Sequence, residues 1–236
     1  MVEDDPFVTQ RDGLDVAAEL DSAGFADAVE IGRGGFGRVY RCVQRVVDRT
    51  VAVKVLTGDH HDDRERFFRE ERAMAQLTGH PNIVDMFEVG MTVSGLPYIV
   101  MPYHARGSLD THIRHIGPLP LAETLRLGVK LAGALETAHR AAVLHRDIKP
   151  SNILITDYDQ PALADFGIAR ITGGFETSTG TVTGSPAFTA PEVLAGASPS
   201  PASDVYGLAA TLFCALTGHA AFERRSGEQL VAQFVR

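Results

Sequence analysis

The sequence has little cysteine, few basic residues and no long apolar segment. Only Cys42 and Cys214 occur in 236 residues, which is too few for a disulfide framework and fits a reducing compartment. No run approaches the roughly 18 apolar residues of a membrane span, and residues 1–6 lack the basic start of a signal peptide. Thirty acidic against 22 basic residues give a formal charge of −8, which disfavours binding to nucleic acid or an anionic membrane. We therefore expect an acidic, cytoplasmic, globular protein without nucleic-acid or membrane partners.

The composition and the patterning are those of a folded protein with two structural halves. Apolar residues make up 44% and charged residues 22% of the chain, which excludes disordered and fibrous proteins. Residues 1–24 are polar and acidic and are predicted to form a flexible arm. Residues 25–103 are rich in β-patterned runs and residues 104–236 in helical patterns. We predict an α+β fold with a β-rich N-lobe, a helical C-lobe and a crevice between them.

Hydrophobic periodicity places the individual elements. Strands are expected around a glycine-rich turn and a second turn within residues 29–55, and then at 83–87, 98–101, 153–155 and 162–164. Helices are expected at 62–77, 121–139 and 205–217, and another begins at 228. The apolar face of helix 121–139 is predicted to consist of Leu121, Leu125, Val129, Ala132 and Leu135.

A glycine-rich segment lies near the start of the β-rich half, at Gly32, Gly34, Gly35 and Gly37. Glycines let backbone N–H groups approach a polyphosphate because no side chain obstructs them. A strand pattern follows rather than a helix, which disfavours a dinucleotide site. No Gly-Lys-Ser/Thr sequence closes the segment, so it is not a Walker loop either. Taken alone, the pattern also fits an ordinary glycine-rich hairpin.

Two charged residues lie where the pattern otherwise predicts burial. Lys54 follows an apolar run on a strand, and Glu70 lies on the apolar face of helix 62–77. An isolated lysine in such a place usually extends from an edge strand into solvent. A carboxylate on a buried face is costly without a partner. We predict that Lys54 and Glu70 pair with each other beside the phosphates of a nucleotide.

The most specific pattern is HRDIKPSN at residues 145–152, followed in order by DFG at 165–167 and APE at 190–192. Together with the glycine-rich segment and Lys54, these motifs resemble the eukaryotic-type (Hanks) protein kinase family, whose signature set has this order. The resemblance covers residues 25–236. Within the family, the stretches at 173–177 and 218–225 are most similar to bacterial, actinobacterial serine/threonine kinases of the protein kinase K type.

The resemblance implies the chemistry of these motifs. Asp147 would be the catalytic base toward the substrate hydroxyl, and Lys149 would neutralise the γ-phosphoryl group. Asn152 and Asp165 would hold two Mg²⁺ ions, with Mn²⁺ as an alternative ion. A lysine at the position of Lys149 marks serine/threonine specificity in this family. The implied enzyme is a non-specific protein serine/threonine kinase that uses ATP.

The resemblance also places the nucleotide. Adenine would bond the Pro102 carbonyl and the backbone of His104, and Met101 would be the gatekeeper residue in front of them. Relatives often have glutamate at the position of Pro102, but proline keeps the carbonyl acceptor. Val39, Ala52 and Leu154 would enclose the purine. The implied ATP-binding residues are Ile31, Gly32, Arg33, Gly34, Gly35, Phe36, Gly37, Val39, Ala52, Lys54, Met101, Pro102, His104 and Leu154.

Several residues would have structural roles. By resemblance, His145 would stack with Phe166, Met86 and Met74 rather than act in catalysis. Asp204 would be a buried anchor that bonds back to the backbone of the 145–152 loop, although a helix N-cap is the alternative on local sequence.

The Ser/Thr-rich stretch between DFG and APE is interpreted as an activation segment. A Ser/Thr cluster is usually a flexible polar loop, but Arg146 next to Asp147 could pair with a phosphate on it and order it. By spacing, Thr177 and Thr179 match the autophosphorylation sites of bacterial relatives. Ser185 would contact Asp147 and Lys149 where the substrate docks.

The chain stops at Arg236, where the family normally adds two more helices. We therefore expect a C-lobe truncated at its C-terminal end, in which the buried carboxylate of Glu192 lacks its usual arginine partner and stability is reduced. A regulatory region beyond residue 236 is expected from the resemblance. A homodimer is a possible assembly that the sequence does not decide.

Other interpretations are weaker. A pseudokinase that only binds nucleotide would normally lack a residue of the Lys54, Asp147 or Asp165 type, and a small-molecule phosphotransferase would not need the long segment from 165 to 192. The sequence HHDD at 60–63 could bind a metal, but a solvated loop explains it better because no second ligand pair lies nearby. His112 and His115 lie one helical turn apart and are expected to be exposed.

Overall fold

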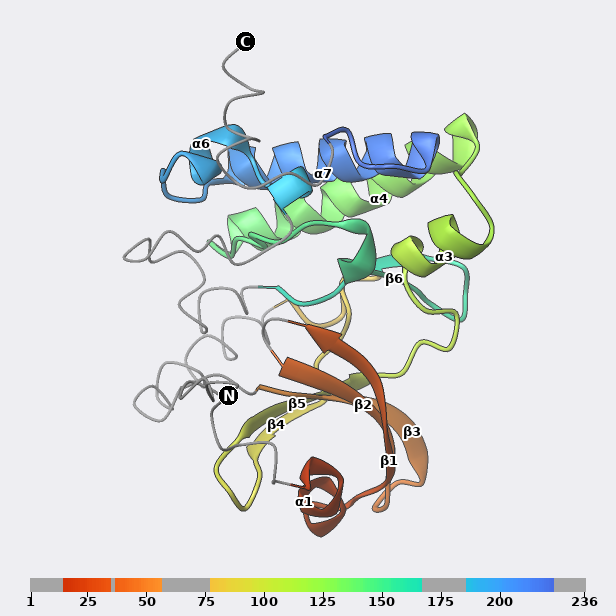
Figure 1. Cartoon of the computed structure of the whole chain (residues 1–236), viewed down its shortest axis with the longest axis vertical. Coiled ribbons are helices and arrows are strands. Elements are labelled where there is room, and N and C mark those ends of the chain that lie inside the picture. The colour runs from red at the N-terminus through yellow and green to blue at the C-terminus, as the bar shows by residue number, and fades with distance from the viewer. Residues whose placement is uncertain (1–14, 35–36, 57–76, 167–185, 223–236) are drawn as a thin grey trace, which may run out of the picture.

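A computed structural model describes residues 15–34, 37–56, 77–166 and 186–222 of the chain. Figure 1 shows two parts, a strand-rich N-lobe and a helical C-lobe, so the α+β two-lobed fold predicted from the sequence is confirmed. The predicted helices at 62–77 and from 228 lie, except for Leu77, outside the described residues. No helix in the described part of the chain is long and apolar enough to cross a membrane.

The N-lobe contains a five-stranded antiparallel sheet in the order β1-β2-β3-β5-β4. Its strands are β1 (Phe25–Gly34), β2 (Gly37–Gln44), β3 (Arg49–Val55), β4 (Glu88–Met91) and β5 (Pro97–Pro102). The first three follow the predicted pattern of strand, glycine turn, strand, turn and strand. All of residues 51–55 on β3 are buried, because β3 lies inside the sheet between β2 and β5.

The N-terminal arm predicted for residues 1–24 is not loose throughout. Helix α1 (Val16–Ser22) begins at Asp15, whose side chain accepts a hydrogen bond from the Ala18 N–H. Val16 and Leu20 are buried in the same apolar cluster as Phe25, against one face of the sheet. The residues before Asp15 lie outside the described part. Only two of the seven side chains of this helix are buried, so its sequence is mostly polar and does not show a helical apolar pattern.

The strand predicted at 83–87 is wrong. Ile83 is buried and forms an isolated parallel bridge with Leu163, and the Val84 N–H donates to the Leu163 carbonyl. The edge strand β4 begins only at Glu88 and pairs with β5. Ile83 therefore packs in the apolar cluster of the C-lobe, whereas the Val84 side chain packs against the N-lobe cluster of Ala52 and Met101, and the sheet uses only the residues that follow.

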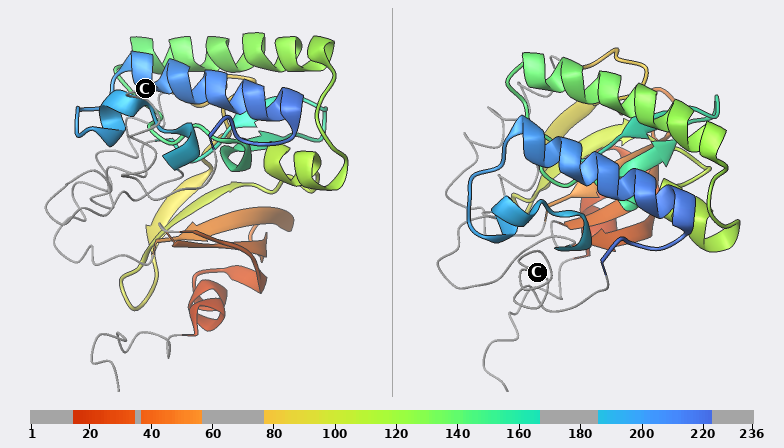
Figure 2. Two further views of the ribbon diagram at one scale, coloured as in Figure 1. Left: turned by 45° about the horizontal axis from the view of Figure 1, so that its top comes forward. Right: turned by 90° about the horizontal axis from the view of Figure 1, so that it is seen from above.

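The C-lobe is built around two long helices that lie side by side, α4 and α7 (Figure 2). Its elements are α3 (Leu109–His115), α4 (Leu121–Arg140), η1 (Pro150–Asn152), β6 (Ile153–Ile155), β7 (Pro161–Leu163), η2 (Pro186–Phe188), α6 (Pro191–Leu194) and α7 (Pro201–Thr217). The β6–β7 hairpin agrees with the prediction to within one residue. Its inner residues Ile153 and Leu163 belong to the large apolar cluster under α4.

Helix α4 has the predicted length, but its predicted core-facing side is largely wrong. Leu121, Leu125 and Val129 are 62%, 61% and 75% exposed, and Leu135 alone of the five predicted residues is buried. The buried face instead comprises Thr124, Leu127, Leu131, Ala134, Leu135 and Ala138. Apolar residues recur at helical spacing on both sides of α4, and its contacts with α7 and β7 determine which side is buried.

Candidate active site

Lys54 is the penultimate residue of strand β3, in its buried part, where it pairs in register with Val39 and Ile99. Its residue surface is only 5% exposed, so its ammonium group requires a charged or polar partner. The Lys54 Nζ atom lies 2.7 Å from the Asp165 Oδ2 atom. This ion pair joins a strand of the N-lobe to the DFG segment of the C-lobe. Glu70, the partner predicted for Lys54, lies outside the described residues.

Asp165 follows strand β7 and has a left-handed backbone, with φ = +64°. Non-glycine residues adopt this conformation rarely, and such residues are concentrated at functional sites. Burial would by itself raise the pKa of the Asp165 carboxyl, but the Lys54 ammonium and its hydrogen bond outweigh this, with help from Lys149. The net result is a pKa below the usual value, so Asp165 is a carboxylate at neutral pH.

The carboxylate of Asp147 is held on one side only. Its Oδ2 atom accepts hydrogen bonds from Lys149 Nζ at 2.6 Å and from Asn152 Nδ2 at 3.0 Å. Within the described part of the chain, no hydrogen bond is made to its Oδ1 atom, and the side chain is 15% exposed. An oriented carboxylate with one free oxygen can accept a hydrogen bond from an incoming hydroxyl.

Asn152 lies at the end of the short helix η1 and ties the HRDIKPSN loop to the DFG segment. Its Nδ2 atom donates both to the backbone carbonyl and to the carboxylate of Asp147. Its own backbone carbonyl accepts from the N–H of Ala164, the residue before Asp165. With the amide nitrogen used in this way, the amide oxygen is left as a ligand atom.

The donors at Asn152 and Asp165 fit a magnesium ion. Mg²⁺ prefers oxygen ligands and is usually held by one or two carboxylates together with substrate phosphates and water, not by an all-protein cage. One amide oxygen and one carboxylate of lowered pKa form such a partial set. The described residues contain no cluster of three or more His, Cys, Asp or Glu side chains that could hold a metal ion.

Asp204 anchors the HRDIKPSN loop from helix α7, as predicted. Its carboxylate is almost fully buried and accepts hydrogen bonds from the backbone N–H of His145 at 2.9 Å and of Arg146 at 2.8 Å. The alternative of a helix N-cap is wrong, because the N-cap of α7 is Ser200, four residues earlier, which forms a capping box with Ser203. Arg146 has a left-handed backbone with φ = +70°, a conformation that the anchor helps to hold.

His139, near the C-terminal end of α4, has a supporting role that the sequence does not predict. Its Nε2 atom lies 2.9 Å from Asp204 Oδ2, so Asp204 is bonded to α4 as well as to the loop. The only local signal was a polar residue at the end of an apolar helix, which is common for residues with no such contact. Its partner lies 65 residues further along the chain.

His145 is fully buried and packs against Phe166, with ring centroids 4.5 Å apart. Burial lowers its pKa despite the nearby carboxylates of Asp204, Asp147 and Asp165, so the ring is neutral. Its Nδ1 atom accepts from the Asp147 backbone N–H at 3.3 Å. These contacts support the predicted structural role. Met86 packs in the apolar cluster of Ala52 and Met101, and Met74 lies outside the described residues.

The glycine-rich segment forms the β1–β2 hairpin. Gly34 pairs with Gly37 and Gly32 with Val39 across the two strands. Gly37 has φ = +146°, and a Cβ atom there would lie 2.1 Å from the carbonyl oxygen of Val55. Glycine at this position lets β2 lie close to the end of β3, the strand that carries Lys54. Ile31 and Arg33 are exposed on β1, and Gly35 and Phe36 lie outside the described residues.

The residues predicted to surround adenine largely come together. Ala52 pairs in register with Met101 across β3 and β5, and both belong to one apolar cluster against which Val39 packs. Leu154 lies on β6 of the C-lobe, bridged to Ser108. Pro102 ends β5, and two residues later the Nδ1 atom of His104 is buried, with no hydrogen-bond partner among the residues that the structure describes. Burial lowers the pKa of His104, and the charge of Asp157 opposes this.

Of the remaining predicted residues, Glu192 is described by the structure and the others lie outside the described part. Glu192 lies in the first turn of α6 and is exposed, so the buried, unpaired carboxylate predicted there is wrong for the structure described. Only Val193 of that short helix is buried, which leaves Glu192 facing solvent. The predicted residues outside the described part are Gly35, Phe36, Glu70, Gly167, Thr177, Thr179 and Ser185.

Known protein kinases are similar to this chain in sequence. The protein kinase domain family matches residues 25–236. The chain belongs to this family. The kinase chain is 66% identical over its whole length to serine/threonine-protein kinase PknK of Mycobacterium tuberculosis, of which it covers 21%. It is also 36% identical, over 87% of its length, to PrkC of Bacillus subtilis. PknL of Mycobacterium tuberculosis is 35% identical over 94% of the chain, which covers 56% of that protein.

The resemblance to bacterial Hanks-type kinases predicted from the motifs is thereby confirmed. The kinase chain spans about a fifth of the length of PknK and 32% of PrkC.

Proposed function

We propose that this kinase domain transfers the γ-phosphoryl group of ATP to serine and threonine hydroxyls of proteins. The observation that carries the proposal is the convergence of two contacting pairs, Lys54 with Asp165 and Asn152 with Asp147. A backbone hydrogen bond from Ala164, the residue before Asp165, to Asn152 joins the two pairs, although they come from a strand of one lobe and two segments of the other. Phosphoryl transfer needs charge stabilisation and positioning more than a covalent nucleophile. An ammonium, a metal-binding carboxylate and an oriented carboxylate supply these functions.

Each residue has a task in this proposal. Asp147 receives the substrate hydroxyl at its free Oδ1 atom and orients it toward the phosphorus, because its Oδ2 atom is held by Lys149 and Asn152. Lys149 stabilises negative charge on the transferred group from the same side. Lys54 neutralises the phosphates that lie on the N-lobe side. Asn152 and Asp165 would hold Mg²⁺, whose charge would offset that of the phosphate oxygens.

The acceptor class follows from Lys149 and from the length of the segment after DFG. A lysine two residues after the base is the family feature of serine/threonine specificity, and the relatives are named as serine/threonine kinases. Autophosphorylation at Thr177, Thr179 or both, and a role in bacterial signalling or transcriptional regulation, belong to the same proposal. Arg146 next to Asp147 supplies the cation that a phosphate on this segment would need.

The test is transfer of labelled phosphate from ATP and Mg²⁺ to a generic basic protein and to the chain itself. Replacement Asp147→Asn removes the hydroxyl-accepting carboxylate but keeps its shape, so we expect a loss of about 100- to 10,000-fold in transfer rate. Asp110→Asn on the surface of α3 is the matched control and leaves the rate unchanged. Nucleotide binding without transfer by the unaltered chain would favour a pseudokinase, and labelling of small molecules alone would favour the phosphotransferase.

A further inference from the structure

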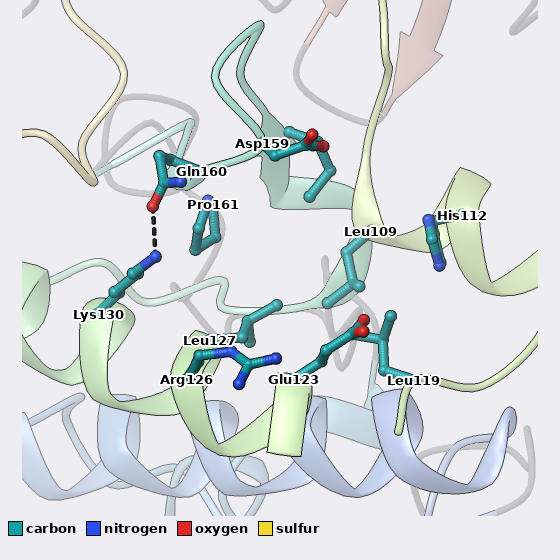
Figure 3. Close-up of a pocket in the computed structure, with 11 residues that line it drawn as sticks. Leu109, His112, Leu119, Glu123, Arg126, Leu127, Lys130, Asp159, Gln160 and Pro161 are labelled. Carbon is teal, nitrogen blue, oxygen red and sulfur yellow. Dashed lines mark hydrogen bonds between the residues drawn. The ribbon is translucent and has the colours of Figure 1, made fainter. Parts of the chain in front are cut away.

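A cavity lies in the C-lobe, away from the residues of the proposed active site. Figure 3 shows it between α3, α4 and the outer end of the β6–β7 hairpin. It has a volume of about 410 Å³, within the range of cavities that hold small ligands. None of Lys54, Asp147, Asn152 or Asp165 lines it. It is therefore a separate feature of the fold and needs its own explanation.

The floor of the cavity is apolar and firmly held. Leu109 and Leu127 are 1% and 7% exposed and belong to the large apolar cluster of the C-lobe, and Pro161 beside them is buried as well. Leu119 and Ile155 complete the apolar lining. An apolar body placed on this floor would lose contact with water without any rearrangement of the surrounding helices.

The cavity lining contains two basic and two acidic side chains, but one of the acids is neutralised by an arginine outside the lining. Lys130 is half-buried, and among the described residues its ammonium bonds only the neutral amide oxygen of Gln160. Arg126, one turn earlier on the same helix, has no ion pair with any residue of the described structure. Of the two acids at the cavity, Asp159 is already paired with Arg106, which leaves Glu123 as the only uncompensated negative charge.

From this arrangement we propose that the cavity binds a small amphipathic anion. Its apolar body would lie on Leu109, Leu127 and Pro161, and its carboxylate or phosphate would reach Lys130 and Arg126. An anion in this position would give both cations the negative partner that they lack, and a charge-assisted hydrogen bond is about twice as strong as a neutral one. Half-buried His112 stands at the opposite side of the cavity, in contrast to its predicted exposure.

The probe for the test is 4-phenylbutyrate, a benzene ring joined by a short alkyl chain to a carboxylate. We expect it to bind the 236-residue chain with a dissociation constant of about 1 mM, a typical affinity for a ligand of this size. The binding is followed by the amide chemical shifts of Ile155, Gln160 and Lys130. Two matched compounds separate the contributions: 4-phenylbutyramide keeps the ring without the charge, and butyrate keeps the charge without the ring. Each should bind about tenfold more weakly.

Variants on α4 locate the site. The double replacement Arg126→Gln and Lys130→Gln should weaken 4-phenylbutyrate binding about tenfold. Arg140→Gln, the same change at the exposed end of that helix, should leave it unchanged. Excess ADP with Mg²⁺ should not displace the probe, because the nucleotide residues lie elsewhere. This test is independent of whether the chain transfers phosphate.

Several results would overturn the proposal. Displacement by ADP would place the probe in the nucleotide site. Equal binding of the amide, or unchanged affinity in the double variant, would mean that the cations have no part in recognition. Shifts on the exposed apolar side of α4, at Leu125 and Val129, would indicate general adhesion to that surface. If the cavity bound a short peptide that contains leucine and glutamate but did not bind 4-phenylbutyrate, it would be assigned to a protein partner.

Discussion

The two lobes hold their parts of the active site in different ways. In the N-lobe, Lys54 is positioned by the backbone pairing of β3 between β2 and β5. In the C-lobe, Asp147 lies in a loop whose backbone is bonded to Asp204 on a helix nearly 60 residues further along the chain. A side chain on a central strand is placed by the sheet itself. A loop side chain needs a buried polar anchor, so the C-lobe is more sensitive to the loss of one charged group.

The largest effect is expected for Asp204→Ala. The change removes the acceptor for two backbone N–H groups and for His139 and leaves them buried, which should cost about 3–5 kcal/mol of the free energy of unfolding. Urea unfolding of the chain measures it. Asp110→Ala, which breaks an exposed ion pair with Arg114 on α3, should cost less than about 1 kcal/mol. Similar losses in the two variants would contradict the anchoring role.

The next largest effect separates the two sides of α4. Leu131→Ala removes a fully buried side chain and should cost about 3 kcal/mol. Leu125→Ala, on the side that was predicted to be apolar and buried, changes an exposed residue and should cost less than about 0.5 kcal/mol. Thermal and urea unfolding of both variants decide between the two faces. A larger loss of stability for Leu125→Ala than for Leu131→Ala would support the buried face that was predicted from the sequence.

A smaller effect is expected in the N-lobe, at Gly37. Alanine there would place its Cβ atom against the Val55 carbonyl in a strained backbone, so Gly37→Ala should cost about 2 kcal/mol. Gly34→Ala is the matched control, since a Cβ atom at Gly34 meets no atom within 4 Å. Unfolding in urea compares the two. If they were equally stable, the close approach of β2 to β3 would not constrain this position.

The smallest effect is a dependence of stability on pH. The pKa of His104 and of His145 lies below 6.5 because of burial, so the folded chain binds fewer protons than the unfolded chain. Their contribution is fully present above pH 6.5 and is lost as the pH falls below it. Between pH 7.5 and 5.5 we expect a loss of about 1 kcal/mol.

The variant His104→Gln should make this pH dependence shallower, whereas His115→Gln at an exposed position should not change it. The lowered pKa of Asp165 does not interfere, because its contribution is lost only below its ordinary value of 3.8. Thermal midpoints measured at several pH values test this. Parallel pH profiles for both variants would remove His104 as a source of the effect.

Much of the fold could be predicted because local patterns repeat. The β1–β2–β3 succession, the β6–β7 hairpin and the length of α4 follow from alternation, turn residues and helical spacing. The errors share one cause. Ile83 looked like a strand residue of the N-lobe but contacts Leu163 in the C-lobe, and the apolar residues on both sides of α4 left its buried side undetermined. Hydrophobicity shows that a residue can be buried but not which partner covers it.

The motifs by themselves determined the family, the order of the functional residues and the expected chemistry, because those depend on residue types at fixed spacings. Only the tertiary structure decided that Lys54 meets Asp165, that Lys149 and Asn152 bond the same oxygen of Asp147, and that His139 supports Asp204. These contacts join residues far apart in the chain, and their distances depend on how helices and sheets pack. A linear pattern carries no information about that packing.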